Sequence, residues 1–355
     1  MSKLQTLWYT RCPVPTPLGI AARLDWVREE FARDGIDVRT LQDESDPILR
    51  DSHFDHTLAN SFRQGGNIPA IWARSTGRKT RVLGLSWTDE AQLIFTRPGS
   101  KVRTIGDLKG KRLGVVTNPH SKIDFWQATT LRAYSAALKL EGLSEADVKL
   151  VELPRADNPL PGGGARGWPR TDPLNLLEIK ALLQGDVDVI FHKGSRGLEA
   201  TQAIGAHVIY DVGKHPDPKV RINNGSPRTL TVDADLVDSH PDIAVRLVKL
   251  VLQAGQWAAK NHDAAIKYVA QETGSTEGAV RLGYGDDVGS HLSTDLEESS
   301  VEALDDFKNF LLKWGFLADD FDVRAWIDSA PLARAKKELA ERGKEATSLL
   351  SAVRV

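Results

Sequence analysis

The chain contains a single cysteine, Cys12, and a thiol is a strong intrinsic nucleophile. One cysteine can form neither an internal disulfide nor a multi-cysteine zinc site. A lone cysteine is more often a small buried residue than a nucleophile. Cys12, however, begins the turn 12–15, which closely follows the apolar segment 7–10 that is typical of a buried strand. Because ligands of open α/β sheets bind at the carboxyl ends of strands, this position favours chemistry or binding.

A second group of residues with chemical potential comprises His53, Arg63 and the pair Gly65-Gly66. A histidine can tune the ionisation of a thiol, a guanidinium binds oxygen anions, and glycine lets backbone amides approach an anion closely. Each residue also has a plainer interpretation, in which the histidine is a surface or capping residue, the arginine balances a helix C-terminus and the glycines end that helix. His53 and His56 could pair on a metal, but no third ligand is in reach, so we expect neither a metal nor another cofactor.

Three further positions are candidates for binding a small molecule. Ser195 lies in segment 193–195, just after a predicted strand, and Asn224 lies in segment 223–226, where the chain is expected to cross between two lobes. Both segments also fit ordinary turns. Trp126, together with Phe125 and Trp168, could form a wall for an aromatic ligand, although aromatic side chains on helices more often belong to the core.

The elements around Cys12 can be predicted from local patterns. Residues 7–10 and 36–41 are expected to form strands, with a helix at 17–33 between them. Thr16 can cap that helix, Pro17 suits its first position, and apolar side chains recur every three or four residues. A second helix is predicted over 55–63, followed by strands at 80–86 and 91–96.

A capped turn and a strand within residues 104–115 mark the entry to a second lobe. There we expect helices at 124–140 and 175–184 and strands at 148–153 and 187–191. Residues 154–173 are too rich in proline and glycine for regular structure, and both a mobile lid and a plain surface excursion fit them.

The chain then returns to the first lobe through a strand at 228–232. A helix capped by Ser239 and begun by Pro241 should follow, and helices at 263–271 and 295–314 complete a largely helical tail. This organisation predicts a first lobe formed by residues 1–100 and 221–355 and a second lobe formed by residues 101–220.

Composition narrows the possible partners. Lys plus Arg number 46 and Asp plus Glu number 48, a net charge of -2, which argues against nucleic acid or an anionic membrane as the main partner. No apolar run approaches the roughly 20 residues that span a bilayer, and the N-terminus has no signal-peptide pattern. We therefore expect a cytoplasmic protein, where a free thiol persists. A monomer is the default expectation.

Two resemblances appear in these residues. Residues 105–115 (IGDLKGKRLGV), 183–188 (LQGDVD) and 239–242 (SHPD) resemble solute-binding proteins of the sulfonate and nitrate group. That resemblance implies an α/β chain with the two-lobed type II periplasmic binding protein-like fold, in which each lobe is an open mixed sheet flanked by helices and the ligand lies in the cleft between the lobes. It identifies a fold and not an activity.

The second resemblance is to the 2'-hydroxybiphenyl-2-sulfinate desulfinase family. It rests on residues 9–15 (YTRCPVP), on His53-Phe54, and on residues 63–69 (RQGGNIP). It implies that Cys12, His53 and Arg63 are catalytic, that Gly65 and Gly66 bind the sulfinate, and that the substrate is a small aromatic sulfinate. The segments 12–53 and 116–131 and the stretch rich in proline and glycine depart from the family, which leaves the aryl group open.

These residue types suit the chemistry. A sulfinate is a monoanion with two acceptor oxygens, which a guanidinium and backbone amides can bind. A thiol tuned by a histidine can either attack the sulfur or protonate the ring carbon, and the sequence favours neither route. The alternative function is a non-catalytic binding protein of a sulfonate or organic-anion transporter, which would need the arginine and the glycines but not the thiol.

Overall fold

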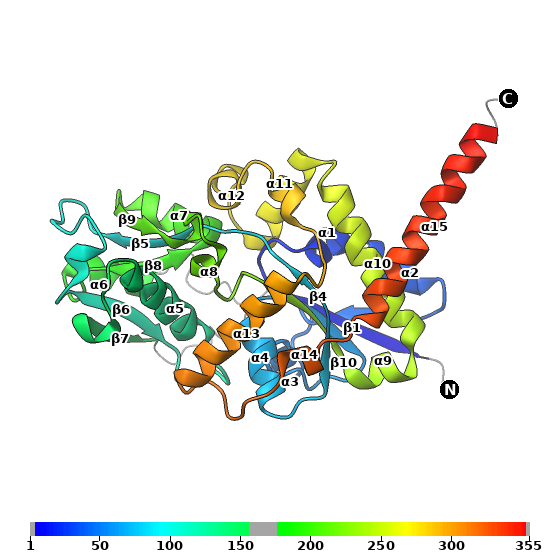
Figure 1. Cartoon of the computed structure of the whole chain (residues 1–355), viewed down its shortest axis with the longest axis horizontal. Coiled ribbons are helices and arrows are strands. Elements are labelled where there is room, and N and C mark those ends of the chain that lie inside the picture. Colours follow the sequence, from blue (N-terminus) through cyan, green and yellow to red (C-terminus); the bar gives the residue numbers. More distant parts are fainter. Residues whose placement is uncertain (1–3, 156–175, 353–355) are drawn as a thin grey trace.

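A computed structural model describes residues 4–155 and 176–352. A five-stranded sheet forms the half that carries both chain ends (Figure 1). Its strands, in spatial order, are β2 (Asp37–Thr40), β1 (Thr6–Arg11), β3 (Ser61–Gly65), β10 (Arg228–Asp233) and β4 (Thr80–Ser86). β1 pairs in parallel with both β2 and β3, whereas β10 runs antiparallel to β3 and β4. The carboxyl ends of β1 and β3 therefore meet the beginning of β10 at one edge.

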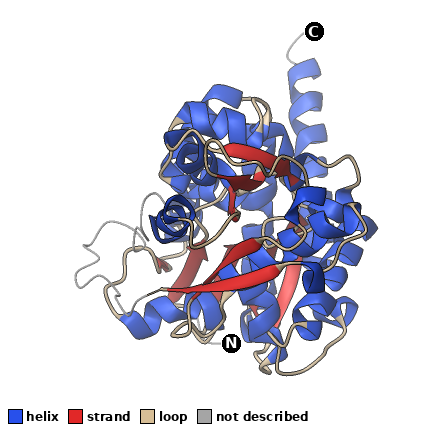
Figure 2. Ribbon diagram, turned by 90° about the vertical axis from the view of Figure 1, so that its left-hand side faces the viewer, coloured by secondary structure: helices blue, strands red, loops and turns tan. Residues whose placement is uncertain are grey.

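Helices cover both faces of the strands (Figure 2). One face packs on α1 (Pro17–Arg23), α10 (Pro241–Ala258) and α11 (His262–Thr273), and the far end of α15 (Ala330–Ala352) extends beyond the body (Figure 1). This core contains fully buried Leu7, Leu18 and Leu230. Thr16 caps α1 by accepting from the Gly19 amide at 3.0 Å, as predicted.

Two expectations for these helices were wrong in detail. The helix predicted over 17–33 is broken, because Asp25 adopts a left-handed conformation (φ 59°) between α1 and α2 (Trp26–Ala32). Aspartate tolerates that conformation, and the apolar stripe continues on both sides, so periodicity does not reveal the break. Ser239 ends α9 (Ala234–Ser239) instead of capping α10, which begins at Pro241 without a side-chain cap.

The helix predicted over 55–63 was also wrong. The helix is α3 (Pro47–Asp55), which Asp46 caps by accepting from the Ile48 amide at 2.8 Å. The chain then turns through His56 and Asn60, both with positive φ, and forms buried strand β3. Gly65 and Gly66 thus end a strand and lead into α4 (Asn67–Ser75).

The other half contains two smaller sheets. β5 (Gln92–Thr96) lies between β8 (Ile190–Lys193) and β9 (His207–Asp211), and β6 (Arg112–Thr117) pairs in parallel with β7 (Lys149–Pro154). A bridge between Leu113 and Val189 connects the two sheets. The helices of this half are α5 (Phe125–Leu140), α6 (Leu176–Gln184), α7 (Gly194–Ala203) and α8 (Pro218–Arg221). The predicted strand at 187–191 is displaced toward β8.

Elements near the C-terminus reach both halves. The remaining helices are α12 (Glu277–Tyr284), α13 (Glu298–Lys313) and α14 (Val323–Trp326). Apolar side chains of α13 share one core with Val82 of the large sheet and Tyr134 of α5. β5 falls within the stretch assigned to the first lobe, yet it pairs with β8 and β9; the lobe boundaries stay a prediction.

Over residues 4–155 and 176–352, none of the helices combines the length and the hydropathy that a bilayer span requires. Of the segment 154–173, only Pro154 and Arg155 lie within the described residues. The two interpretations of this segment, a mobile lid and a surface excursion, therefore concern residues outside the described part of the chain.

Candidate active site

The carboxyl ends of β1 and β3 place Cys12 beside Arg63. The parallel register pairs Thr10 with Arg63, and the Cys12 amide donates to the Gln64 carbonyl at 3.1 Å. His53 comes from the last turn of α3 and reaches the same edge. Two parallel strands and one helix thus bring together residues that are up to 51 positions apart in the sequence.

The predicted trio is in direct contact. The Cys12 Sγ lies 3.4 Å from the His53 Nε2 and 3.0 Å from the Arg63 Nη2. Cys12 is half-buried, whereas His53 and Arg63 are buried. A half-buried thiol with two nitrogen neighbours is an environment in which a cysteine can react, unlike that of a cysteine enclosed by apolar side chains.

Arg63 has an unusual charge environment. Its side chain is 2% exposed, and its Nη1 donates to the Gly66 carbonyl at 2.8 Å. Within the described part of the chain, no carboxylate lies within 4.0 Å of the guanidinium, and the Nε finds no acceptor. Burial lowers the pKa of Arg63, an effect that the charge of Cys12 opposes. A buried guanidinium of this kind favours an anion beside it.

The surroundings of His53 favour its neutral form. Burial lowers its pKa well below the usual value, and the nearby charges of Arg63 and His56 lower it further. Its Nδ1 lies 2.8 Å from the Thr10 hydroxyl, opposite the nitrogen that faces Cys12. In the neutral form, the His53 Nε2 lies within hydrogen-bonding distance of the Cys12 Sγ.

Both predicted glycines are required by close packing. A Cβ at Gly65 would lie 2.2 Å from the Cys12 Sγ, and a Cβ at Gly66 would lie 2.5 Å from the Asn224 Oδ1. Any larger residue at position 65 would push the thiol from its place. The Gly66 amide has no acceptor among the described residues, so it can donate to an anion.

Asn224 supports this edge from the β10 side. Its carbonyl accepts from the Asn67 amide at 2.9 Å, and its Oδ1 accepts from the Ile68 amide at 3.0 Å. These bonds satisfy the first amides of α4, which has no cap of its own. Asn224 therefore holds Gly66 in position, and the free amide of Gly66 is what remains for a ligand.

A row of aromatic rings leads from this edge to Trp126. The His53 and Phe54 rings lie 4.9 Å apart, those of Phe54 and Phe125 stack at 6.0 Å, and those of Phe125 and Trp126 lie 5.2 Å apart. The Arg155 guanidinium lies 5.6 Å from the Trp126 ring. The predicted aromatic wall is thus connected to the site, while Trp168 lies outside the described residues.

Ser195 has a different environment. It lies at the beginning of α7, where its hydroxyl accepts from the Ser275 hydroxyl at 2.7 Å. No contact with Cys12, His53 or Arg63 is found for it among the described residues. Its neighbour Lys193 pairs with buried Glu90 at 2.6 Å. Its role as a substrate contact stays a prediction.

Two polar residues near the thiol were missed. Thr10 contacts His53, and Gln42 contacts Thr10 at 3.1 Å. Thr10 precedes Cys12 by two positions and so lies on the same side of the strand, a signal that the sequence offered. Gln42 had no such signal, because its contact depends on the pairing of β1 with β2.

Other possible sites lie elsewhere. No three His, Cys, Asp or Glu side chains of the described residues gather closely enough to hold a metal ion, and the His56 Nε2 lies 3.1 Å from the Thr231 hydroxyl.

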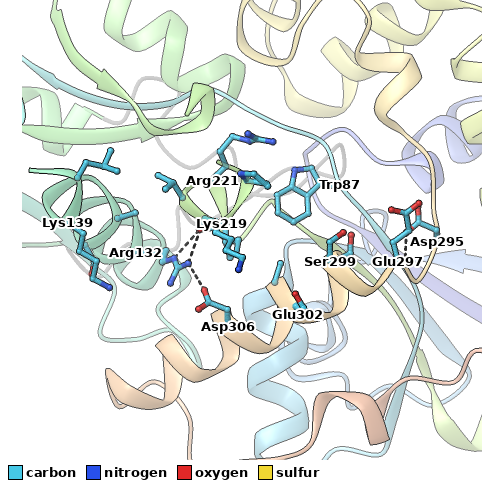
Figure 3. Close-up of a pocket in the computed structure, with 18 of the residues that line it drawn as sticks. Trp87, Arg132, Lys139, Lys219, Arg221, Asp295, Glu297, Ser299, Glu302 and Asp306 are labelled. Carbon is cyan, nitrogen blue, oxygen red and sulfur yellow. Dashed lines mark hydrogen bonds and ion pairs between the residues drawn. The ribbon is translucent and has the colours of Figure 1, made fainter. Parts of the chain in front are cut away.

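A cavity of about 710 Å³ lies between α5, α8 and α13, where Arg132 pairs with Asp306 at 2.6 Å (Figure 3). None of the predicted site residues lines it.

The chain is similar to known proteins over most of its length. The 2'-hydroxybiphenyl-2-sulfinate desulfinase of Rhodococcus erythropolis is 27% identical over 347 residues, which cover 90% of this chain and 91% of that protein. The structure of a cysteine-to-serine mutant of DszB in complex with biphenyl-2-sulfinic acid covers 95% of this chain and 100% of its own, with a TM-score of 0.76 and 25% identity. No family model matches the sequence.

The fold is shared more widely. The periplasmic aliphatic sulphonate binding protein SsuA of Escherichia coli covers 92% of this chain and 93% of its own, with a TM-score of 0.64 and 14% identity. The prediction of a type II periplasmic binding protein-like fold is confirmed, as is the resemblance to the desulfinases. At 14% identity, the likeness to SsuA shows the fold alone.

Proposed function

We propose, from the similarity of this chain to 2'-hydroxybiphenyl-2-sulfinate desulfinases over nine-tenths of its length, that it is a cysteine-dependent aryl sulfinate desulfinase. The reaction takes an aryl sulfinate and water to the arene and hydrogen sulfite, so its atoms balance without a cofactor. One observation carries the proposal: a buried guanidinium with no carboxylate partner among the described residues contacts the only thiol of the chain.

The residues of the proposed site can perform different parts of the reaction. Arg63 offers its Nη2 and the Gly66 backbone offers its amide, and both can donate to the two oxygens of a sulfinate. Cys12 then either attacks the sulfur as a thiolate or delivers its proton to the ring carbon, and both routes agree with its position. His53 donates a hydrogen bond to the sulfur in the first route.

The aryl group of the substrate has a matching surface. The rings of Phe54, Phe125 and Trp126 form a continuous apolar row that begins next to His53. A biaryl substrate anchored by its sulfinate at Arg63 could lie along this row, where aromatic pairs gain about 0.5–1.5 kcal/mol beyond the burial of their area. A hydroxybiphenyl sulfinate and other aryl sulfinates both fit this description.

Sulfite release tests the proposal. The protein is incubated with 2'-hydroxybiphenyl-2-sulfinate and a panel of aryl sulfinates, and free sulfite is measured alongside the variant Cys12→Ser. We expect sulfite from at least one substrate with the parent and a loss of at least 100-fold in the variant. The proposal fails if no substrate releases sulfite or if Cys12→Ser is as fast as the parent. Calorimetric binding of a sulfonate without turnover would favour the solute-binding alternative.

The setting of the activity is part of the same proposal. A reactive free thiol persists in a reducing compartment, which supports a cytoplasmic protein. All the residues of the proposed site come from one chain, which supports a monomer. Cell fractionation and light scattering test these two statements, and a periplasmic location or an obligate dimer would contradict them.

A further inference from the structure

Gln42 follows β2 and has a fixed orientation. Its Nε2 donates to the Arg11 carbonyl at 2.8 Å, and its Oε1 accepts from the Thr40 hydroxyl and from the Arg11 Nη1 at 3.4 Å. A carbonyl can only accept and a guanidinium can only donate. Exchanging the Gln42 Oε1 and Nε2 would place the oxygen against the Arg11 carbonyl and the nitrogen against the Arg11 Nη1. The contacts with Arg11 therefore set the orientation in which Nε2 faces Thr10.

Arg11 is itself held in place. Its Nε donates to the Glu272 Oε2 at 2.6 Å and its Nη2 donates to the Glu272 Oε1 at 3.2 Å, a two-point contact. Glu272 lies in α11, and its side chain is 5% exposed. The group that orients Gln42 is therefore anchored to a helix on the outside of the sheet.

The direction of the next hydrogen bond follows from proton counting. The Gln42 Nε2 donates to the Thr10 hydroxyl at 3.1 Å, so that oxygen is an acceptor in this pair. The hydroxyl still has one proton to donate, and because no other acceptor for it lies in reach among the described residues, we assign that proton to the His53 Nδ1 at 2.8 Å. Because His53 is neutral, a Nδ1 that accepts leaves the ring proton on Nε2, which faces the Cys12 Sγ.

The sulfur therefore faces two N–H groups, one from His53 and one from Arg63. A thiolate can accept from both N–H groups, whereas neither group offers an acceptor for the proton of a thiol. We propose that Gln42 is a positioning residue that sets the chain Gln42→Thr10→His53→Cys12, so that a His53 N–H donates to the Cys12 sulfur in its thiolate form. The effect of Gln42 on turnover rests on the proposed desulfinase function, but its effect on the thiol does not.

Alkylation by iodoacetamide tests the proposal directly, since Cys12 is the only cysteine and only the thiolate reacts. Gln42→Glu reverses the chain, because a carboxylate takes the Thr10 proton, Thr10 then accepts from the His53 Nδ1, and Nε2 becomes an acceptor. We expect its alkylation at pH 7 to be about tenfold slower than that of the parent, because the thiolate loses one hydrogen-bond donor.

Neutral variants separate this effect from added charge. Gln42→Met and Thr10→Val remove hydrogen bonds that place the His53 ring proton on Nε2, without adding a carboxylate. We expect both variants to slow alkylation severalfold. Thr10→Ser keeps the hydroxyl and should match the parent. The proposal is overturned if Gln42→Met and Thr10→Val react at the parent's rate, or if Thr10→Ser is as slow as Thr10→Val.

The parent protein offers a test that does not depend on whether the variants fold. Nitrogen-15 shifts of the His53 ring, assigned by comparison with His53→Gln, distinguish a proton on Nε2 from one on Nδ1. We expect the Nε2 form, and the Nδ1 form would overturn the proposal. Sulfite release is measured separately, so a protein that shows these thiol effects but no turnover would contradict the proposed function alone.

Discussion

Arg63 is the residue in which function and stability are most clearly opposed. A buried guanidinium without a carboxylate partner among the described residues weakens the fold, since its hydration is lost and only partly replaced. We predict that Arg63→Met lowers sulfite release on the order of 100-fold. The free energy of unfolding should stay equal or rise by up to about 2 kcal/mol.

Denaturant unfolding and steady-state kinetics check this pair of effects. Arg63→Lys, which keeps the charge but loses the two-pronged geometry, is the matched control and should retain more activity than Arg63→Met. A loss of stability greater than about 3 kcal/mol in Arg63→Met would mean that the guanidinium is structural.

Gly65 tests how tightly the thiol is placed. Gly65→Ala sets a methyl group 2.2 Å from the present position of the Cys12 Sγ, so the sulfur must move. Because a displacement of about 1 Å at a reacting atom can cost about 100-fold, we predict a loss of that order in sulfite release. Gly278→Ala, in α12 with no atom within 4 Å of the added group, is the control and should keep full activity. Equal rates for Gly65→Ala and the parent would contradict the geometry.

At the residue scale, the sequence pointed to the proposed trio because its motifs are local. Cys12, His53 and Arg63 could be proposed one by one, and the structure brings His53 and Arg63 within 3.4 Å of the Cys12 sulfur. Gln42 could not be identified, since its contact with Thr10 depends on how two strands pair. Ser195 had the same local features as Asn224, namely a turn near a strand, and only tertiary structure separates their surroundings.

At the element scale, most strands and most of the long helices were predictable, whereas the break after α1 and the position of α3 were not. β4 has the predicted bounds, and α5, predicted over 124–140, spans Phe125–Leu140. The helix placed at 55–63 was wrong because Gly65-Gly66 suits the end of either a helix or a strand. The buried environment of β3 between β1 and β10 decides between them, and no local pattern contains that information.

Asn224 gives a prediction at this scale, because it caps a helix from another segment. Asn224→Ala removes the acceptor of the Ile68 amide and should lower the free energy of unfolding by about 1 kcal/mol. Asn224→Asp keeps the acceptor and adds a negative charge at the beginning of α4, which should retain stability. That charge lies against Gly66, so it should raise the KM for an aryl sulfinate severalfold by repulsion.

Thermal melts and kinetics of the two variants separate the roles of Asn224. A KM for Asn224→Asp equal to that of the parent would mean that the sulfinate does not bind at Gly66, whereas equal melting of Asn224→Ala and the parent would mean that the cap is dispensable.

At the scale of the whole molecule, side chains as well as backbone join the two halves. The aromatic row runs from α3 into α5, Lys122 pairs with Asp55, and α13 shares a core with both halves. A two-lobed arrangement was predictable from the alternation of strands and helices. The contacts between the two halves were not predictable, because no sequence pattern links the residues that meet there.

Buried histidines predict how the whole molecule responds to acid. Burial lowers the pKa of His192 and of His56 to about 3, while the unfolded chain titrates near 6.5. The native state thus binds fewer protons than the unfolded state below about pH 6.5, so stability is lost as the pH falls through this range. Each such histidine should remove about 2 kcal/mol between pH 7 and pH 5.

His192 is the better one to test, because it lies apart from the proposed site, against Phe95 and 3.9 Å from Glu178. We predict that His192→Leu loses about 2 kcal/mol less than the parent between pH 7 and pH 5 in denaturant unfolding. His240→Gln, at a half-buried position where α10 begins, is a control that should follow the parent. Equal acid losses for parent and His192→Leu would mean that the buried imidazole gains a proton in the native state, with Glu178 as its partner.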